Sequence, residues 1–456
     1  MAIEEINKEF IQNIEELIAS KKDDAILSLL ADEHSADIAE IIDLLNLNDA
    51  TYLFKLLDSE TTAEALMEID DDDREKILKN LSAEEIADEI DELDTDDAAD
   101  IIAELPQERI TEVISEIEDD DHAKDIVELL QYDEGTAGSI MAKELIKVKE
   151  KWNVLTCVSK IRTQAQEVTR VHSIYVVDKQ DILKGRLSLK DLLVAPDETL
   201  ISDIYIPKVD SVFVDDEIEE VARIMQKYDL EAIPVVDVRN RLLGRITIDD
   251  IVDFIKEEAE KDYQMAAGIT EDVEADDSIK ELIKARLPWL IIALIGGFVS
   301  VWILSGFNTA LADHAVLFFF TPLIAATAGN VGVQSSAIVV QAIANDTLKG
   351  STWKRLIKEV SLSLVNGIIL AGILLIVEKL FLSHIIPGMD MMVGLTVAIS
   401  LVSVIILASL IGTFIPIFLH KRGIDPAVAT GPFITTSNDI FGIFIFFFIA
   451  KLILGF

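Results

Sequence analysis

The chain has 456 residues and a formal net charge of −43, yet half of its residues are hydrophobic. These properties conflict for one globular domain and fit two unlike halves, because residues 1–135 carry 44 Asp and Glu against 9 Lys and Arg, whereas residues 288–456 carry 7 against 8. Such an acidic half repels nucleic acid, which excludes nucleic acid as a partner, and attracts polyvalent cations. Cys157 is the only cysteine, so an intrachain disulfide framework is excluded.

Residues 45–129 contain an apolar repeat with a period of twelve. Its steps are Leu45, Leu57, Ile69, Leu81, Leu93, Leu105, Ile117 and Leu129. The residue after most steps is a helix-cap former or proline: Asn46, Asp58, Asp70, Ser82, Asp94 and Pro106. Each unit therefore predicts one short capped helix, and the stacked units predict an all-α superhelical domain at 1–135.

Acidic residues crowd at these predicted helix starts, for example at Asp70–Asp73 and at Asp96–Asp97. Caps and helix dipoles account for some of them. The excess opposes compaction through like-charge repulsion, so we expect a subset of these acids to bind cations.

A second repeat follows, with a constant offset of 59 residues. The segment HSIYVVDKQDILKGRLSLKDLL at 172–193 matches EAIPVVDVRNRLLGRITIDDIV at 231–252. Each copy predicts strand, turn, strand and a capped helix. This resembles the α/β CBS-domain pair, which we place at 136–200 and 201–261.

CBS pairs often bind adenine nucleotides such as ATP, and a Ser or Thr and an Asp of the final motif contact the ribose. The resemblance therefore implies Thr247 and Asp250 as nucleotide contacts, with Ser188 and Asp191 as their counterparts in the first copy. This motif alone does not establish nucleotide binding.

Five stretches after Pro288 are long and apolar enough to cross a bilayer. They are Trp289–Phe307, Ala315–Ala344, Val360–Leu382, Met391–Leu419 and Ala427–Phe456. We therefore predict an all-α membrane domain of five helices at 288–456, preceded by a connecting plug helix at 262–287.

Basic residues lie on one side of these spans. They are Lys280, Lys284 and Arg286 before the first span, Lys349, Lys354, Arg355 and Lys358 before the third, and Lys421 and Arg422 before the fifth. The positive-inside rule then places the N-terminus in the cytoplasm and the C-terminus outside the inner (plasma) membrane.

Asp439 is the informative ionisable residue, because it falls within the last span. A carboxylate at that depth costs at least about 2.5–3.5 kcal/mol unless it meets water, an ion or a partner. Thr435 lies one helical turn before it, and Pro432 is expected to free a backbone carbonyl nearby. Asn330 and Gln334 add a polar face to the second span, in AGNVGVQSS, which fits either a pore wall or ordinary contact between helices.

The order of these parts, with the segments GNVGVQSS, DPAVATGPFITTSNDIFG and YDEGTAGSIM, resembles the MgtE family of magnesium channels. The resemblance implies a homodimer in the lipid bilayer, with Asp439 setting cation selectivity and Asn330 also at the pore. Val333 departs from the family pattern GNxGNQ, in which a second amide is common.

The resemblance also implies regulatory magnesium bound between the cytosolic domains. The implied ligands are Asp96, Asp100, Glu217, Glu219, Asp229, Asp250, Asp253, Glu258 and Asp262. Lys261 stands where an acid is expected, which puts one of these sites in doubt.

The sequence thus predicts a magnesium channel or transporter that cytosolic magnesium closes, and not an enzyme, because no nucleophile–base or Cys/His metal cluster is present. Two rivals stay open. One is a CBS-regulated transporter of Mn²⁺ or Co²⁺. The other is a membrane-anchored CBS sensor without transport, which the presence of Asp439 within a span argues against.

Overall fold

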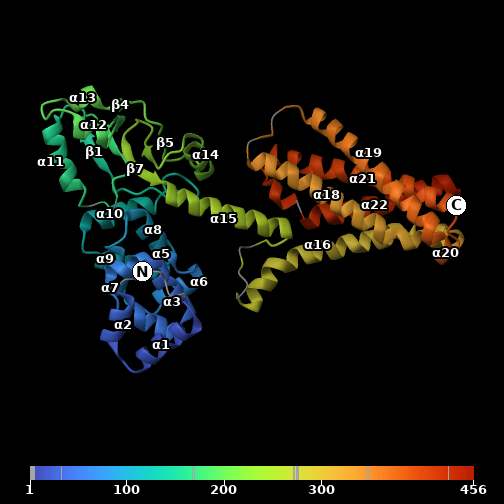
Figure 1. Cartoon of the computed structure of the whole chain (residues 1–456), viewed down its shortest axis with the longest axis horizontal. Coiled ribbons are helices and arrows are strands. Elements are labelled where there is room, and N and C mark those ends of the chain that lie inside the picture. Colours follow the sequence, from blue (N-terminus) through green and yellow to red (C-terminus); the bar gives the residue numbers. More distant parts are fainter. Residues whose placement is uncertain are drawn as a thin grey trace. The chain divides into compact units, whose positions relative to one another are not determined.

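The computed structural model describes residues 6–31, 33–166, 168, 170–270, 273, 277–345, 347–348, 350–429 and 431–456. The chain forms two compact units, Met1–Ile255 and Lys256–Phe456 (Figure 1). Lys349 and the side chains of Asp71 and Asp72 lie outside the described part.

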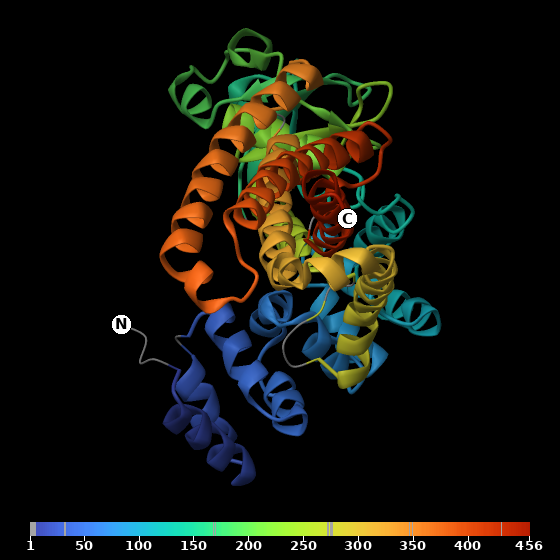
Figure 2. The ribbon, with the colours of Figure 1, turned by 90° about the vertical axis from the view of Figure 1, so that its right-hand side faces the viewer.

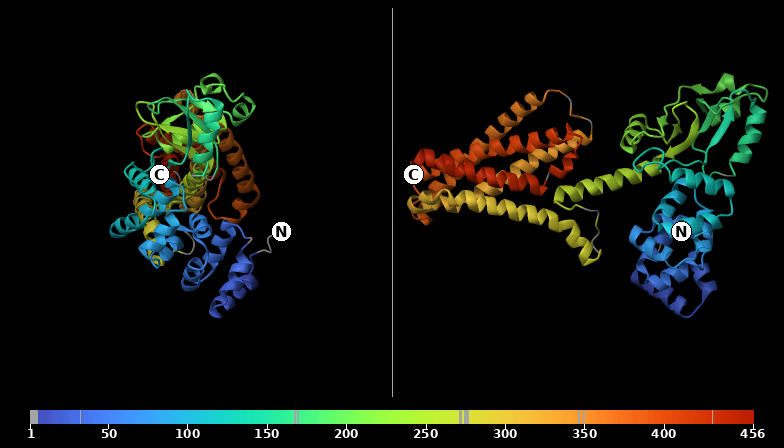
Figure 3. Two further views of the ribbon diagram at one scale, coloured as in Figure 1. Left: turned by 90° about the vertical axis from the view of Figure 1, so that its left-hand side faces the viewer. Right: turned by 180° about the vertical axis from the view of Figure 1, so that it is seen from behind.

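The first unit begins with a stack of short helices (blue to teal in Figure 3). They are α1 Lys8–Ala19, α2 Asp23–Leu30, α3 Ser35–Leu44, α4 Leu47–Phe54, α5 Ser59–Glu68, α6 Asp71–Leu78, α7 Ala83–Ile90, α8 Thr95–Ala103, α9 Gln107–Glu116 and α10 Asp120–Leu129. The first residues of α3 to α9 are each twelve positions apart, which confirms the helical reading of the repeat.

The expected caps explain why these helices begin where they do. The side chains of Asn46, Asp58 and Ser82 each accept a hydrogen bond from a backbone N–H in the first turn of their helix. Asp94 occupies the same position before α8 but makes no side-chain cap bond. Its carboxylate is engaged elsewhere, as described below.

The CBS pair follows in the same unit as two small sheets. Its elements are β1 Ile146–Lys149, α11 Val154–Gln164, β2 Ile174–Val177, β3 Leu183–Leu187, α12 Leu189–Val194, α13 Ile201–Ile204 and β4 Ile206–Pro207, then β5 Val212–Phe213, α14 Ile218–Tyr228, β6 Ala232–Val236, β7 Leu242–Thr247 and α15 Ile248–Ala267. The strand orders are β1-β2-β3-β4 and β5-β6-β7, with a parallel first pair and antiparallel pairs after it in each sheet.

The two copies join through their turns, where Ile182 forms an antiparallel bridge with Arg241. In each copy a repeat glycine makes room for a neighbouring backbone. A Cβ at Gly185 would overlap the Ile206 carbonyl oxygen, and one at Gly244 would lie 2.6 Å from the Ala142 carbonyl oxygen. The glycines of the 59-residue repeat are therefore needed for close backbone approach.

Among its described residues, the second unit contains five helices long and apolar enough to cross a membrane: Ile279–Ser305, Ala315–Ala344, Thr352–Ile385, Met391–His420 and Gly431–Leu454. Their elements are α16 Ile279–Ser305, η1 Ala315–Phe320 with α18 Thr321–Ala344, α19 Thr352–Val377 with the π-helical turn η2 Glu378–Leu382 and α20 Ser383–Ile385, α21 Met391–His420, and α22 Gly431–Leu454. Two short helices, α17 Asn308–Asp313 and η3 Pro426–Ala429, lie between them.

The connector expected at 262–287 is not one helix. Helix α15 runs on from the CBS pair to Ala267 and stops at Gly268, whose φ of 84° is left-handed. Helix α16 then begins at Ile279, well before the apolar stretch, because Ser278 and Glu281 form a capping box there. Pro288 lies inside α16.

Figure 2 shows the long helices of the second unit, yellow to red. Small residues let these helices pack closely. A Cβ at Gly296 of α16 would overlap Thr436 of α22, and one at Gly332 of α18 would overlap Asn438 of α22. A Cβ at Gly412 of α21 would overlap the Gly332 carbonyl oxygen. Helices α18, α21 and α22 therefore share one closely packed crossing.

Candidate cation sites

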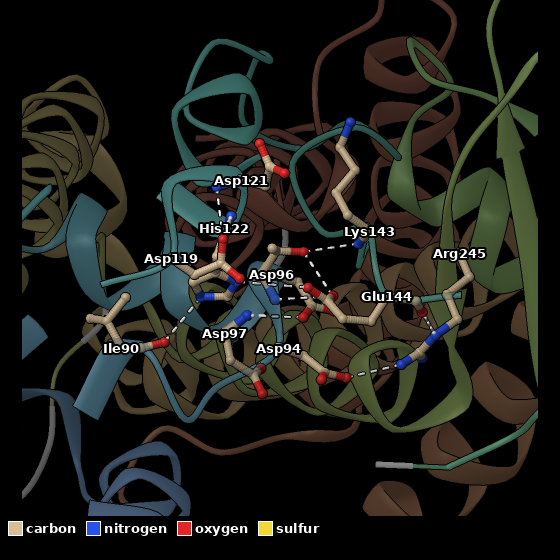
Figure 4. A network of polar contacts seen from close by, with 11 residues as sticks. Ile90, Asp94, Asp96, Asp97, Asp119, Asp121, His122, Lys143, Glu144 and Arg245 are labelled. Atoms are coloured by element: carbon tan, nitrogen blue, oxygen red, sulfur yellow. Dashed lines mark hydrogen bonds and ion pairs between the residues drawn. The ribbon is translucent and has the colours of Figure 1, made fainter. Parts of the chain in front are cut away.

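A cluster of carboxylates lies in the first unit, where the start of α8 meets the segment before β1 (Figure 4). Carboxylate oxygens of Asp94, Asp96 and Glu144 lie within 4.8 Å of one another. Lys143 and Arg245 flank the group, and His122 Nδ1 lies 3.9 Å from Glu144 Oε1. Such an oxygen set suits a hard divalent cation.

Burial and mutual repulsion dominate the electrostatics of this cluster. Burial first, and then the charges of Asp97 and Asp250, raise the pKa of Asp96 well above its usual range. Burial first, and then the charge of Asp250, raise the pKa of Asp97 to about 7. The ionised forms of these acids are therefore disfavoured in the compact unit unless a cation compensates them.

Asp250 comes from the other side of the cluster, in the first turn of α15. Its Oδ2 accepts hydrogen bonds from the Thr247 backbone N–H at 2.8 Å and from the Thr247 hydroxyl at 2.7 Å. Burial is the largest cause of its raised pKa. The sequence names Asp250 both as a nucleotide contact and as a cation ligand, and the structure turns its charge towards Asp96 and Asp97.

The nucleotide candidates of the first copy are differently placed. Ser188 caps α12 and accepts a hydrogen bond from the Asp191 backbone N–H at 3.4 Å. Asp191 is exposed, whereas Thr247 in the second copy is buried.

Asp100 is one of the remaining candidates, and after burial and the charges of Asp250 and Asp94 its charge also raises the pKa of Asp97. Asp100 and Asp253 are exposed. Glu217 precedes α14 and Glu219 lies in its first turn, whereas Asp229 ends that helix of 11 residues. At about 1.5 Å per residue the two ends are about 16 Å apart, so one ion cannot hold Glu217 and Asp229 of the same chain.

A smaller acidic group lies in the second unit, at the end of α15. Burial first, and then the charges of Asp425 and Glu258, raise the pKa of Asp262. Lys261 Nζ lies 3.8 Å from Glu258 Oε1, so this unexpected lysine partly neutralises a predicted ligand. Asp425, which the sequence offered no reason to single out, faces Asp262 instead.

Asp439 lines a cavity of about 690 Å³ in the second unit. The walls come from the end of α15, from α16 and from α22, and they include Ala266, Gly268, Trp289, Gly296, Pro432, Thr435 and Asp439. Within the described residues, Asp439 makes no hydrogen bond or ion pair, whereas the Thr435 hydroxyl donates to the Gly431 carbonyl at 2.8 Å. The carboxylate is thus available to a ligand in the cavity.

Pro432 lines this cavity, but the expected reason was wrong. It is the second residue of α22, where a missing N–H leaves the helix intact, so it frees no carbonyl from the body of the span. One glycine of the second span, Gly329, lies close to Thr435 and Asp439. A Cβ at Gly329 would lie 3.2 Å from Thr435 Cγ2 and 4.0 Å from Asp439 Oδ1.

Asn330 and Gln334 lie one turn apart on α18, are exposed, and are not among the lining residues of the cavity. A pore that includes them therefore requires more than the face that α15, α16 and α22 supply.

Two known proteins called magnesium transporter MgtE align with most of the chain. The protein from Enterococcus faecalis is 38% identical over 325 residues, covering 71% of this chain and 70% of its own. The protein from Thermus thermophilus is 35% identical over 329 residues, covering 72% of each. The chain belongs to the MgtE family.

Family models assign the parts of this MgtE chain in the same order. The MgtE intracellular N domain matches residues 33–135, CBS domains match 137–198 and 201–257, and the divalent cation transporter model matches 321–449. Membership of this family, with five membrane-length helices, makes the chain a multi-pass membrane protein of magnesium transport.

Two solved structures resemble about the first half of the chain. One is described as the soluble part of a magnesium transporter, with 31% identity and a TM-score of 0.50, covering 55% of this chain and 99% of that one. The other is the cytosolic domain of the Mg²⁺ channel MgtE in complex with ATP, with 31% identity and a TM-score of 0.51, covering 54% and 99%.

Five residues at these MgtE sites are not among the ligands that the sequence predicted: Asp94, Asp97, Glu144, Arg245 and Asp425. Asp94 was predicted only as a helix cap and Asp97 only as one of the crowded acids, whereas Arg245 stands in the repeat as the counterpart of Arg186. The partners of Glu144 and Asp425 are distant in sequence, and no local pattern reports such pairs.

Proposed function

We propose that this chain is a magnesium-conducting channel of the inner membrane that closes when cytosolic magnesium is plentiful. The observation that carries the proposal is Asp439, a carboxylate of a membrane helix that faces a cavity of about 690 Å³. A carboxylate at that depth costs about 2.5–3.5 kcal/mol, which a passing cation offsets. The named relatives are transporters and not enzymes, in keeping with this role.

The lining chemistry favours a hard cation that keeps part of its water. Asp439 and the Thr435 hydroxyl supply oxygen only, and magnesium sheds water reluctantly. A homodimer would bring a second copy of this face, and the exposed Asn330 and Gln334, to a shared pore. Oxygen ligands also accept Mn²⁺ and Co²⁺, so competition among these ions in the flux assay tests selectivity for magnesium.

The sensor consists of the acids around α8 and α15. When magnesium is plentiful, it bridges carboxylates such as Asp96, Asp97 and Asp250 and favours the compact first unit. When magnesium is scarce, their repulsion favours a looser form. The ion needs only to prefer one of the two forms to shift their populations.

The end of α15 carries the response to the membrane helices. A Cβ at Gly268 would collide with Pro432, and one at Gly431 would collide with the Ala266 carbonyl oxygen, so this end of α15 packs against the start of α22. A cation between Asp262 and Asp425 would hold that contact and narrow the approach to Asp439.

The orientation of the chain in the membrane is inferred from the basic loops, which place the N-terminus in the cytoplasm and the C-terminus outside. ATP is proposed as a second ligand of the CBS pair, because a solved relative of the cytosolic part holds ATP. Thr247, Asp250, Ser188 and Asp191 are the candidate contacts.

Magnesium influx into vesicles that contain the purified protein tests the pore. The parent should conduct, and Asp439→Ala should not. Glu359→Gln is the matched control, because Glu359 already accepts a hydrogen bond from the Ser335 hydroxyl at 2.6 Å. Undiminished flux in Asp439→Ala would exclude Asp439 from the pore, and absence of flux in the parent would favour a membrane-anchored sensor.

A further inference from the structure

Arg245 of β7 is a buried cation beside the acidic cluster of α8. Its side chain is 7% exposed, and its Nη2 donates to Asp94 Oδ2 at 2.9 Å. Its Nε donates to the Glu144 carbonyl oxygen at 2.6 Å. One guanidinium therefore binds the residue that precedes α8 and the segment that precedes β1.

The N-terminus of α8 is capped from a distance. Asp94 occupies the cap position but makes no cap bond, because its carboxylate is paired with Arg245. Glu144 caps the helix in its place: its Oε2 accepts from the Thr95 N–H at 3.1 Å and from the Thr95 hydroxyl at 2.9 Å. The Thr95 hydroxyl accepts in turn from the Lys143 N–H at 2.8 Å.

Backbone pairing fixes Arg245 in this place. The Ala142 N–H donates to the Arg245 carbonyl at 2.8 Å, and the Arg245 N–H donates to the Ala142 carbonyl at 2.9 Å. Gly244 leaves the room for this approach. The guanidinium therefore extends from a backbone that is held in place, and its two acceptors lie on segments that are far apart in sequence.

The internal repeat shows that the CBS fold itself does not require this arginine to be buried. Arg186 occupies the equivalent position in the first copy, next to Gly185, and it is exposed. Of these two arginines, Arg245 alone is buried and ion-paired within the part of the chain that the structure describes. Arg245 is covered by the residue before α8 and by the segment before β1, whereas Arg186 has no such cover among the described residues and is exposed.

We propose that Arg245 is a positioning residue that clamps α8 to the second CBS copy without any metal ion, and so sets the magnesium concentration at which the sensor responds. The clamp rests on the proposed function in one respect, the binding of magnesium by the α8 acids. A fixed guanidinium offsets part of the repulsion among Asp94, Asp96 and Glu144 before an ion arrives. Magnesium then completes a site whose ligands are already close together.

Hydrogen exchange of the α8 amides, residues 95–103, in the full-length protein tests the clamp in chelator. Arg245→Gln should speed their exchange at least tenfold, and Arg186→Gln, the matched control from the repeat, should leave it unchanged. Arg245→Lys should recover part of the protection, because it keeps the charge and loses the forked geometry. Equal α8 exchange in the parent and Arg245→Gln would overturn the proposal.

Asp94→Asn removes the same ion pair from the other side and serves if Arg245→Gln does not fold. It should also speed α8 exchange at least tenfold in chelator, and unchanged exchange would again count against the clamp.

A magnesium titration of the same exchange separates the clamp from the sensor. Half-maximal protection of α8 should need at least tenfold more magnesium in Arg245→Gln than in the parent. A lower requirement would show that the arginine competes with the ion, and would overturn the proposal. If the parent shows no response to magnesium, the sensor fails, while the comparison in chelator still decides the clamp.

Discussion

The chain carries partly buried carboxylates in two settings, and their surroundings differ in the hydrogen-bond donors that they offer. In the first unit Asp94, Glu144 and Asp250 each accept hydrogen bonds from protein donors. In the membrane unit Asp439 faces a cavity and has no such donor among the described residues. A sensor must hold its acids in place so that an ion changes the free energy of domain docking, whereas a conduction site must leave its acid unsatisfied so that ions can enter and leave.

Neutralising two acids of the proposed sensor should have the largest effect, and the effect should be on closure by magnesium. Asp97→Asn combined with Asp250→Asn removes two charges that magnesium is proposed to bridge, so closure should need roughly 5–150-fold more internal magnesium, the range of a coupling of about 1–3 kcal/mol. Flux at low magnesium should stay at the level of the parent, because Asp439 is untouched.

Asp191→Asn is the control for that pair, since Asp191 is the exposed counterpart of Asp250 in the repeat. Vesicle flux against internal magnesium, without nucleotide, is the measurement. Closure at the parental magnesium concentration in the double variant would remove these acids from the sensor.

Gly268→Ala tests the link between the two settings. Its φ of 84° strains any other residue, and a Cβ would collide with Pro432. A strain of roughly 1–3 kcal/mol should weaken magnesium-dependent closure by about tenfold or more, with the open channel still conducting. Gly372→Ala is the control, because a Cβ there meets nothing within 4 Å. Normal closure in Gly268→Ala would mean that this contact transmits nothing.

A change of pH should have the smallest of these effects, and it should act on the docking of the first unit in chelator. Burial, followed by the charge of Asp250, raises the pKa of Asp97 to about 7, so the docked unit binds a proton that an undocked chain releases near pH 4. Docking in chelator is then strongest below about pH 4, weakens as the pH rises towards 7, and levels off above it.

Between pH 6 and pH 8 the loss should be about 1 kcal/mol, the size of roughly one pKa unit of differential interaction. Exchange of the α8 amides at the two pH values, corrected for intrinsic rates, measures it. Asp97→Asn should flatten the dependence, and an unchanged slope in that variant would assign the proton to another group.

Periodic and compositional features of the fold could be predicted from the sequence. The helix starts from Ser35 to Gln107 follow the twelve-residue repeat, and Val176 and Val235 fall at equivalent strand positions 59 residues apart. Apolar length found the spans, although a capping box at Ser278 began the first of these helices earlier than hydropathy suggested. Helix propensity, caps and apolar periodicity depend on residues close together in the sequence, so a short stretch of sequence is enough to predict them.

The site was less predictable, because its partners meet only after folding. Arg245 and Asp94 are 151 positions apart, and nothing near Asp425 in the sequence indicates Asp262. Pro432 was assigned to the body of a helix of which it is in fact the second residue. The approach of Gly329 to Asp439 depends on helix crossing, which hydropathy does not encode.

At the left-handed turn of Gly268, the helices that are in contact are not the helices that are consecutive in the sequence. Along the polypeptide, α15 is followed by α16, and α22 comes last. In space, the residues at this turn contact Pro432 and Gly431, so a displacement of the α15 terminus reaches the final helix directly and bypasses the four membrane-length helices described between them. Through these contacts, a movement of the α15 terminus can reach the helix that carries Asp439 without passing along the chain between them.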